Sequence, residues 1–279
     1  CRILPSRSSS ATPMPIERNS VFHVPVLAKE VISQLEPKSS GCYLDCTVGG
    51  GGHARLILEA SSPEGRLYGI DQDEEAIRAA SQALKPYGPR VKLRQGNFRA
   101  AREIFRNLTF NGILLDLGVS SHQLDVPGRG FSCDRDGPLD MRMDRNSYIS
   151  AYDLINNLTE DEISNILRTY GQERWHNRIA HSLVRERIHS PISTTTQLSE
   201  IVVRSIPHHK GHWRIHPATR VFQALRIYVN HELENIKSLF PENCGQMEIG
   251  CELSQEKFYF VMEDPENNVD ADKIKLNRK

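Results

Sequence analysis

The sequence predicts an α/β fold, in which a parallel sheet with flanking helices carries an inserted helical domain. Two observations support this prediction. Short apolar runs at 42–44, 66–71, 91–98 and 112–116 alternate with helical patterns, which is the order of a parallel sheet with crossover helices. From about 125 to 215 helical patterns follow without a further strand. The 279 residues suffice for a large α/β core plus an insertion.

A glycine-rich turn follows the first predicted strand. The stretch Asp45-Cys46-Thr47-Val48-Gly49-Gly50-Gly51-Gly52-His53 leads from that strand into a helix at 54–59. Gly49 and Gly51 permit a tight turn and close approach of a ligand to the backbone. The N–H groups that open the helix then face an anionic group. Many α/β units use such turns for packing alone, so the glycine run does not decide the function by itself.

The other predicted strands also end in residues suited to a nucleoside. Asp71 lies 20 residues beyond Gly51, the spacing at which a carboxylate reaches a ribose diol. Parallel strands place their carboxyl ends along one edge, where open α/β sheets bind ligands. The strand ends that meet there are Asp45, Asp71, Asn97 with Phe98, and Asp116.

The turn favours S-adenosylmethionine over a nicotinamide dinucleotide. A dinucleotide fold normally has its first glycine directly after the strand and its third inside the helix. Here Asp45 ends the strand, and His53 and Ala54 open the helix. An acid in that position suits a cationic ligand with an amino group. A dinucleotide oxidoreductase stays as the alternative.

Helices are expected on both sides of these strands. The apolar spacing predicts a helix at 23–35 that packs on the first strand, and crossover helices at 73–84 and 99–106. A polar loop at 117–124 then begins a long irregular segment that extends to Asp144. A loop of this length in a compact domain is usually functional.

The insertion is expected to be helical. Thr159 and Glu162 form a capping box for a helix that Gly171 closes. Further helices are predicted at 174–189 and 196–206. A helix at 221–236 is expected to return to the sheet.

Basic residues are concentrated in the insertion. Between 163 and 231 ten Lys or Arg residues face three acids, and eight of the eleven histidines fall there. Such a surface attracts phosphate backbones, although a solvated helix face is the simpler alternative. The histidines at 208–216 suggest a metal, but no acid or cysteine accompanies them in the chain. We therefore expect a loop that contacts nucleic acid, and no metal.

Composition limits the classes of protein to which this chain can belong. The net charge is zero, and no apolar run approaches the roughly 20 residues that span a membrane. Six cysteines without C-x-x-C spacing argue against a zinc ribbon or a disulfide framework. Residues 1–20 hold three arginines, four serines between 6 and 10, and one acid, Glu17, as in an organelle transit segment. A disordered linker is the alternative.

Several strings resemble one family. They are the 45–53 turn, Asp116-Leu-Gly-Val-Ser-Ser121, Arg129-Gly-Phe-Ser132, Gly137-Pro-Leu-Asp-Met-Arg-Met-Asp144, Tyr170-Gly171-x-Glu173-Arg174 and His216-Pro-Ala-Thr-Arg220. Together they resemble the RsmH (MraW) family of methyltransferases, which act on cytosine N4 of small-subunit ribosomal RNA. The resemblance runs from about 23 to 234. It implies a Rossmann-like sheet of the class I methyltransferase type, and the leader suggests the mitochondrial form.

The resemblance also implies roles for the residues of the donor site. Gly51, Gly52 and His53 hold the methionine part of S-adenosylmethionine, Asp71 the ribose and Phe98 the adenine, while Asp116 and Gln123 complete the site. With Asp45 and Gly49 from the turn, these are the predicted cofactor residues. The helical insertion is taken to bind RNA.

The chemistry of N4 methylation suggests a catalytic residue. The N4 lone pair is delocalised into the ring, so an acceptor on the N4 protons makes it a better nucleophile. Asp116, or a carbonyl of the 117–121 loop, is our candidate. Phe131 is a candidate for stacking on the base, with core packing as the alternative. The base must leave its stack, which favours a single-stranded loop.

The chain departs from the family after Glu234. Residues 242–279 carry nine acids and five bases, and the family's last strands are absent or replaced. A substitute strand is predicted at 258–262. An alternative splice product would explain the change, and a catalytically weak RNA-binding assembly factor is the alternative function.

The predicted division is therefore a leader at 1–20, a donor-binding domain at 21–124 plus 216–236, the insertion at 125–215 and an acidic tail at 237–279. The expected partner is small-subunit ribosomal RNA or the assembling subunit, in the mitochondrial matrix or alternatively the cytoplasm.

Overall fold

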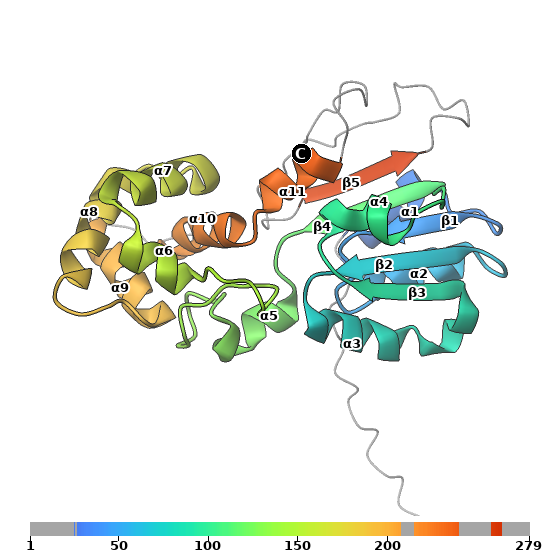
Figure 1. The fold of residues 1–279 in the computed structure, drawn as a ribbon, viewed down its shortest axis with the longest axis horizontal. Coiled ribbons are helices and arrows are strands. Elements are labelled where there is room, and N and C mark those ends of the chain that lie inside the picture. Colours follow the sequence, from blue (N-terminus) through green and yellow to red (C-terminus); the bar gives the residue numbers. More distant parts are fainter. Residues whose placement is uncertain (1–24, 26, 208–214, 240–257, 264–279) are drawn as a thin grey trace, which may run out of the picture.

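The four predicted strands form one parallel sheet, which a fifth strand extends. The computed structural model describes residues 25, 27–207, 215–239 and 258–263. The strands lie in the order β3-β2-β1-β4-β5, and β5 pairs antiparallel with β4 (Figure 1). Their bounds are β1 (Cys42–Asp45), β2 (Arg66–Asp71), β3 (Val91–Gln95), β4 (Gly112–Leu117) and β5 (Phe258–Glu263). The substitute strand predicted at 258–262 is thus present.

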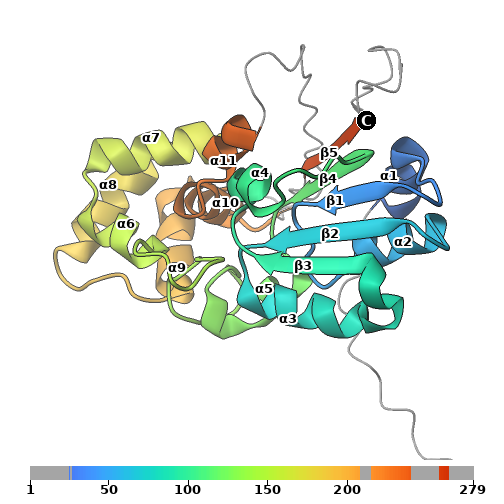
Figure 2. The ribbon, with the colours of Figure 1, turned by 45° about the vertical axis from the view of Figure 1, so that its right-hand side comes forward.

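Alternate residues of the parallel strands pack on opposite faces of the sheet. Tyr43 and Leu67 join the core beneath one set of helices, while their chain neighbours Leu44 and Tyr68 join the core on the other side. This period of two requires cover on both faces. The first face carries α1 (Ala28–Leu35), α2 (Gly52–Ala60) and α3 (Glu74–Ala83), and the second carries η2 (Phe98–Ala100), α4 (Ala101–Ile104) and α11 (Glu232–Leu239) (Figure 2). We call this part the sheet lobe.

A second core lies in the helical lobe beside the sheet (Figure 1). Its helices are α6 (Ala151–Asn157), α7 (Glu160–Gly171), α8 (His176–Arg187), α9 (Thr195–Ser205) and α10 (Thr219–Val229). The capping box at the start of α7 is confirmed, because Thr159 Oγ1 accepts from the Glu162 N–H and the Glu162 carboxylate accepts from the Thr159 N–H. Ser150 and Thr194 begin α6 and α9 in the same way.

The helix predicted at 221–236 is two helices. The chain breaks at His231, whose φ is +52°, and α10 packs on α7 within the helical lobe. Only α11 reaches the sheet, where Ile236 joins the core. The expectation that the whole segment returns to the sheet was therefore wrong, because the apolar stripe of α10 is buried against α7. The helical lobe extends past residue 215 to include α10.

Gly171 does not close α7 as predicted. The residue with left-handed backbone is Gln172, with φ +47°. Gly171 instead lies against α10, where a Cβ would come within 2.4 Å of the Arg220 carbonyl oxygen and 3.0 Å of Ala224 Cβ. The missing side chain lets the two helices approach.

The long loop between the lobes is held by a buried arginine. Arg129 follows α5 (Ser121–Asp125) in η3 (Pro127–Arg129), and its side chain is 1% exposed. Its guanidinium lies 2.7 Å from Asp73 and 3.0 Å from Glu75, and it donates to the carbonyls of Arg142 and Met143. This arrangement ties the end of the loop to the start of α3.

Some predictions fall outside the described residues. These are the leader at 1–20, most of the histidine loop at 208–216 and most of the tail at 237–279. In the part of the chain that the structure describes, no helix has the length and apolar character needed to cross a membrane.

Replacement of Gly171 by Ala is expected to lower the free energy of unfolding by about 1–3 kcal/mol, because the new methyl group forces α7 and α10 apart. Gly128→Ala is the matched control: a Cβ there meets nothing within 4 Å, so a change within about 0.5 kcal/mol is expected. Urea denaturation of both variants measures this difference. Equal stability of the two would contradict the close packing of α7 on α10.

Candidate functional site

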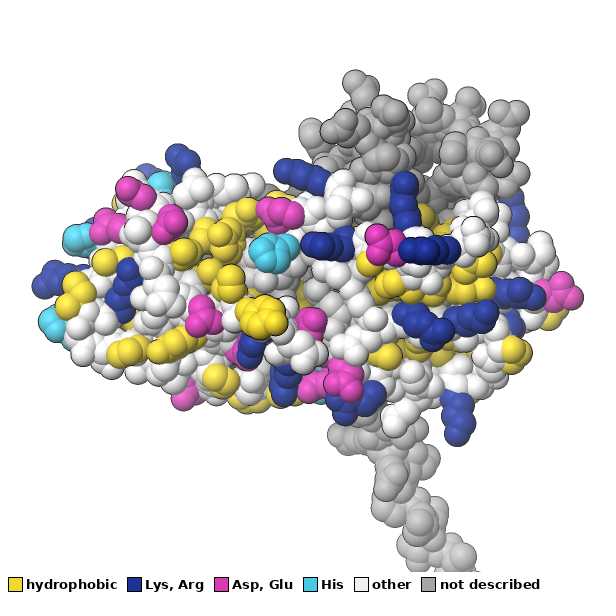
Figure 3. Space-filling view, in the orientation of Figure 1, with side chains coloured by type: hydrophobic (Ala, Val, Ile, Leu, Met, Phe, Trp, Pro, Cys, Tyr) yellow, Lys and Arg dark blue, Asp and Glu magenta, His cyan; other side chains and the backbone are white. Residues whose placement is uncertain are grey.

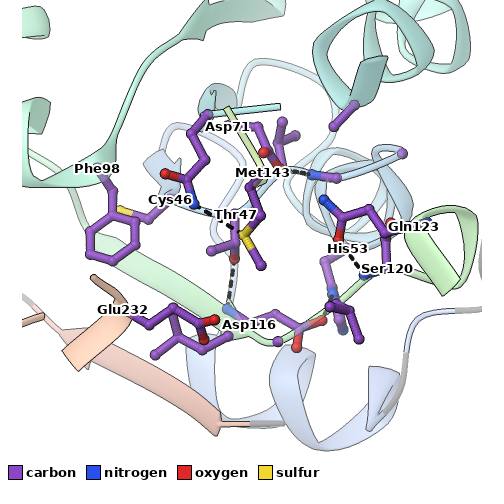
Figure 4. A pocket seen from close by; sticks show the side chains of 18 of the residues that line it. Cys46, Thr47, His53, Asp71, Phe98, Asp116, Ser120, Gln123, Met143 and Glu232 are labelled. Carbon is purple, nitrogen blue, oxygen red and sulfur yellow. Dashed lines mark hydrogen bonds and ion pairs between the residues drawn. The ribbon is translucent and has the colours of Figure 1, made fainter. Parts of the chain in front are cut away.

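A cleft lies at the carboxyl ends of the parallel strands (Figure 4). Its volume, counted together with the open space at its mouth, is about 930 Å³. Seven of the predicted site residues line it: Gly49, Gly52, His53, Asp71, Phe98, Asp116 and Gln123. Asp45 and Gly51 do not.

Gly51 lies behind the cleft because of its packing. Its φ is +86°, and a Cβ there would lie 3.2 Å from Leu84 Cγ at the end of α3. At Gly49, with φ +50°, an added Cβ would meet only the Thr47 carbonyl oxygen, at an ordinary contact distance of 3.8 Å, and this glycine lines the cleft. The turn thus needs Gly49 for its backbone conformation and Gly51 for both conformation and contact with α3. Direct contact of Gly51 with a ligand is not supported.

Asp45 is buried beneath the turn. Oδ1 accepts from the Thr47 N–H at 3.1 Å, and Oδ2 has no hydrogen-bond partner among the described residues. Burial, together with the nearby charges of Asp116 and Asp71, raises the pKa of this carboxyl to about 7, against the lowering effect of the hydrogen bond from Thr47. Asp45 does not line the cleft, so we predict that it influences a ligand through its charge and through Thr47.

Asp71 is fixed at the end of β2 by two backbone donors. Gly49 N–H donates to Oδ2 and Asp73 N–H donates to Oδ1, both at 2.9 Å. Each oxygen keeps a further lone pair for a ligand hydroxyl. Burial raises the pKa of Asp71 to about 6, against the opposing effect of the two donors. The predicted contact with a ribose is compatible with this geometry.

Asp116 is fixed at the end of β4. Its N–H donates to Thr47 Oγ1 at 2.7 Å, so the turn after β1 positions it (Figure 4). Its Oδ2 lies 3.6 Å from His53 Nδ1 at the start of α2. These contacts link three elements of the sheet lobe around one carboxylate.

The adenine side of the predicted site combines an aromatic ring with a thioether. Phe98 begins η2 and lines the cleft. Across from it Met143 Sδ lies 3.0 Å from Gln72 Nε2, and Asn97 donates to Gln72 Oε1 at 3.2 Å. Met143 belongs to the long loop, so the Arg129 contacts bring it to the edge of the sheet.

Sequence reasoning missed residues that come from distant parts of the chain. Thr47 and Met143 lie within the 45–53 and 137–144 motifs that resemble the family, so the sequence contained a signal for both residues. Ser120 caps α5 through Gln123. Glu232 and Asn235 line the cleft from α11, and both Glu232 oxygens accept from buried Arg226. Nothing in the local pattern around 232–235 distinguishes them.

The charges of the cleft select a cation. Three carboxylates line it, but that of Glu232 is paired with buried Arg226, which leaves Asp71 and Asp116 with no Lys or Arg among the described lining residues. S-adenosylmethionine carries a sulfonium and an ammonium group, which this set of acids complements. A dinucleotide carries an anionic pyrophosphate, which the set repels. The cleft therefore fits the methyl donor and disfavours the dinucleotide alternative.

Comparison with known proteins also indicates a protein that uses a methyl donor. The model of the MraW methylase family matches residues 20–263. The chain belongs to this family. It is 52% identical over 220 residues to the "Ribosomal RNA small subunit methyltransferase H" of Geotalea uraniireducens, covering 77% of this chain and 70% of the relative. The protein of the same name from Trichlorobacter lovleyi is 46% identical over 240 residues, covering 85% and 77%.

Family membership confirms a class I methyltransferase fold and S-adenosylmethionine as the cofactor. The family match reaches β5, beyond the 23–234 over which the strings resemble the family. The cleft is thus the donor site of a methyltransferase, and the individual contacts of each residue with the donor stay predictions.

The helical lobe carries less surface charge than the sequence suggested. Arg226, counted among its bases, is buried against Glu232. Arg187 is half-buried and donates to the Ile155 carbonyl. Arg168, Arg178 and Arg204 are exposed as predicted. Part of the apparent basic surface therefore stabilises the lobe itself.

Three possible metal ligands that are not all neighbours in the sequence lie close together. Within the described residues, Cys133, Asp134 and His216 bring one ligand atom each to within 4.8 Å of one another. His216 Nδ1 already accepts from the Ala218 N–H. A structural zinc site takes four ligands, and these three side chains do not line the donor cleft.

The affinity for S-adenosylmethionine is expected to rise with pH between about 5.5 and 7.5. The folded pKa values of Asp71 and Asp45, about 6 and 7, lie above the roughly 3.9 of an unfolded Asp. Folding thus favours the protonated carboxyls, and their contribution to stability falls as pH rises from about 4 through about 7. A cation favours the ionised form, so binding releases protons.

Calorimetric titration in buffers of different ionisation enthalpy measures this release. Asp71→Asn should weaken binding and reduce the dependence on pH, whereas Asp161→Asn, an exposed acid of α7, should change neither. An affinity independent of pH would contradict the role of these carboxyls.

Proposed function

We propose that this chain transfers the methyl group of S-adenosylmethionine to the N4 amino group of a cytosine in small-subunit ribosomal RNA. The observation that carries this proposal is the carboxylate of Asp116, held at the end of β4 beside the donor cleft. The relatives at 52% and 46% identity, named as small-subunit ribosomal RNA methyltransferases, support the substrate.

The donor, when bound, supplies a methyl group on a sulfonium, which is already activated for attack. The protein must then orient the amino group in line with it. Asp116 accepts a hydrogen bond from N4, which draws the lone pair out of the ring and towards the methyl group, and it takes the proton that N4 loses when the new N–C bond forms. Thr47 fixes the backbone of Asp116, so the carboxylate does not need to reorganise.

The segment after β4 shapes the entrance for the base. Leu117, Gly118, Val119 and Ser120 all line the cleft. Their carbonyls are second candidates for an acceptor on N4. Phe131 does not serve as a stacking surface here, because it is 6% exposed and packs in the core of the helical lobe. Core packing, the alternative weighed for this ring, is what the structure shows.

We further propose that this protein is a mitochondrial form of the enzyme and acts on 12S-type ribosomal RNA. Its support is the composition of residues 1–20, rich in Arg and Ser and poor in acids. Import of a reporter fused to residues 1–20 into the mitochondrial matrix tests it. A reporter that stays in the cytoplasm would favour the cytoplasmic alternative.

Transfer of labelled methyl groups to a small-subunit ribosomal RNA transcript tests the reaction. Nucleoside mass spectrometry should find N4-methylcytidine. Asp116→Asn is expected to lower the rate constant of methyl transfer by about 100-fold, the smaller end of acid–base effects, whereas the exposed-site control Asp134→Asn should not change it.

Two outcomes would contradict the proposal. Methylation of another atom would overturn the assignment of N4, and an undiminished rate in Asp116→Asn would remove this residue from the mechanism. Binding of both donor and RNA without methyl transfer would favour the alternative, a catalytically weak RNA-binding assembly factor.

A further inference from the structure

A basic surface covers one side of the sheet lobe, away from the helical lobe. Figure 3 shows Lys and Arg side chains gathered over β3 and α4. Five exposed residues that follow one another along this segment make up what we call the β3–α4 basic surface: Lys92, Arg94, Arg99, Arg102 and Arg106.

The two residues of β3 lie on the face that α4 covers. Lys92 pairs in register with Tyr68, and its Nζ lies 5.6 Å from the centre of that ring. The Tyr68 ring contacts the ring of Phe105, directly after α4, at 5.2 Å. Arg94 is two residues beyond Lys92 and therefore points to the same side.

The three arginines of the η2–α4 segment form a row beside them. They recur at intervals of three and four residues, which places them on one side of a helical turn. Each directly follows a buried residue, since Phe98, Ala101 and Phe105 pack on the sheet. The buried residues thus fix the direction in which the arginines point. The row and the two strand residues make one continuous surface.

Among the described residues, no ion pair neutralises the charge of this surface. From 85 to 115 there are seven bases and one acid, Glu103. Arg90 is used internally, because it donates to the carbonyls of Leu58 and Gly65. None of the five surface residues forms an ion pair with an acid in the described part of the chain. Uncompensated positive charge of this kind attracts phosphate groups.

The surface begins at the rim of the donor cleft. Gly96, Asn97 and Phe98 line the cleft, and Arg99 is the next residue. A strand whose base enters the cleft has its neighbouring phosphates within reach of this rim. The substrate RNA has to bind beside the methyl donor, whereas an acidic protein partner does not.

We propose that the β3–α4 basic surface binds the phosphate backbone of the RNA strand that flanks the methylated base. The RNA is then held from two sides, by the helical lobe and by this surface of the sheet lobe. The inference rests on the proposed function for the identity of the RNA, and it adds a second contact that sets the direction of the strand.

The test is the charge reversal Arg102→Glu with Arg106→Glu. Both residues lie outside the donor cleft. Arg55→Glu with Arg78→Glu is the matched control: it makes the same charge change at exposed positions of α2 and α3, on the opposite face of the sheet. Fluorescence anisotropy with a small-subunit ribosomal RNA transcript, at several salt concentrations, measures affinity. Calorimetry with S-adenosylmethionine checks that the cleft is intact.

The surface variant is expected to bind the transcript at least tenfold more weakly than the control. The slope of log affinity against log salt concentration should fall by about 1.4, which is two contacts at about 0.7 each for single strands. Affinity for S-adenosylmethionine should not change. If the charge reversal lowers the melting temperature, the milder variant Arg102→Gln with Arg106→Gln replaces it. This variant should also bind the transcript more weakly than the control, by a smaller factor.

Equal affinity and equal salt slope in the surface and control variants would overturn the inference, while methyl transfer by the unmodified chain would still support the proposed function. Loss of RNA binding in the surface variant, together with no methyl transfer by the unmodified chain, would support the inference and contradict the proposed function.

Discussion

The guanidinium of Arg129 lies in the interior between two carboxylates and two backbone carbonyls. It pairs with Asp73 and Glu75 of the sheet lobe and donates to Arg142 and Met143 of the loop that leads to the helical lobe. Removing one partner of a buried ion pair costs about 3–5 kcal/mol, because the other charge is left without compensation. The position of the loop relative to the sheet depends on this contact.

The position of this loop determines much of one wall of the donor cleft. Gln123 donates to Asp73 at 2.8 Å, and Asn230 accepts from the Met143 N–H while donating to the Met141 carbonyl. Met143 is thereby held from both lobes as it enters the cleft. Asn230 also ends α10, so the start of α11, with Glu232 on the cleft wall, depends on the same contacts. The helical lobe thus completes a site whose other residues belong to the sheet.

The sequence predicts well those features that depend on local pattern. The four parallel strands, the capping box at Thr159 and the positions of Asp71 and Asp116 follow from strand ends and short motifs. The break at His231 was missed because the apolar period runs through it without interruption. Gly51 was misplaced because its orientation depends on Leu84, 33 residues away. Glu232 lines the cleft from the start of α11, where Arg226 of α10 holds it in an ion pair that no local pattern shows.

Arg129 holds the loop that completes the donor cleft. Hydrogen–deuterium exchange of Arg129→Met, combined with calorimetric titration with S-adenosylmethionine, tests this role. We expect faster exchange confined to about 121–145 and an affinity at least tenfold lower, equal to about 1.4 kcal/mol, with the strands of the sheet still protected. Unchanged exchange in this segment together with unchanged affinity would contradict it.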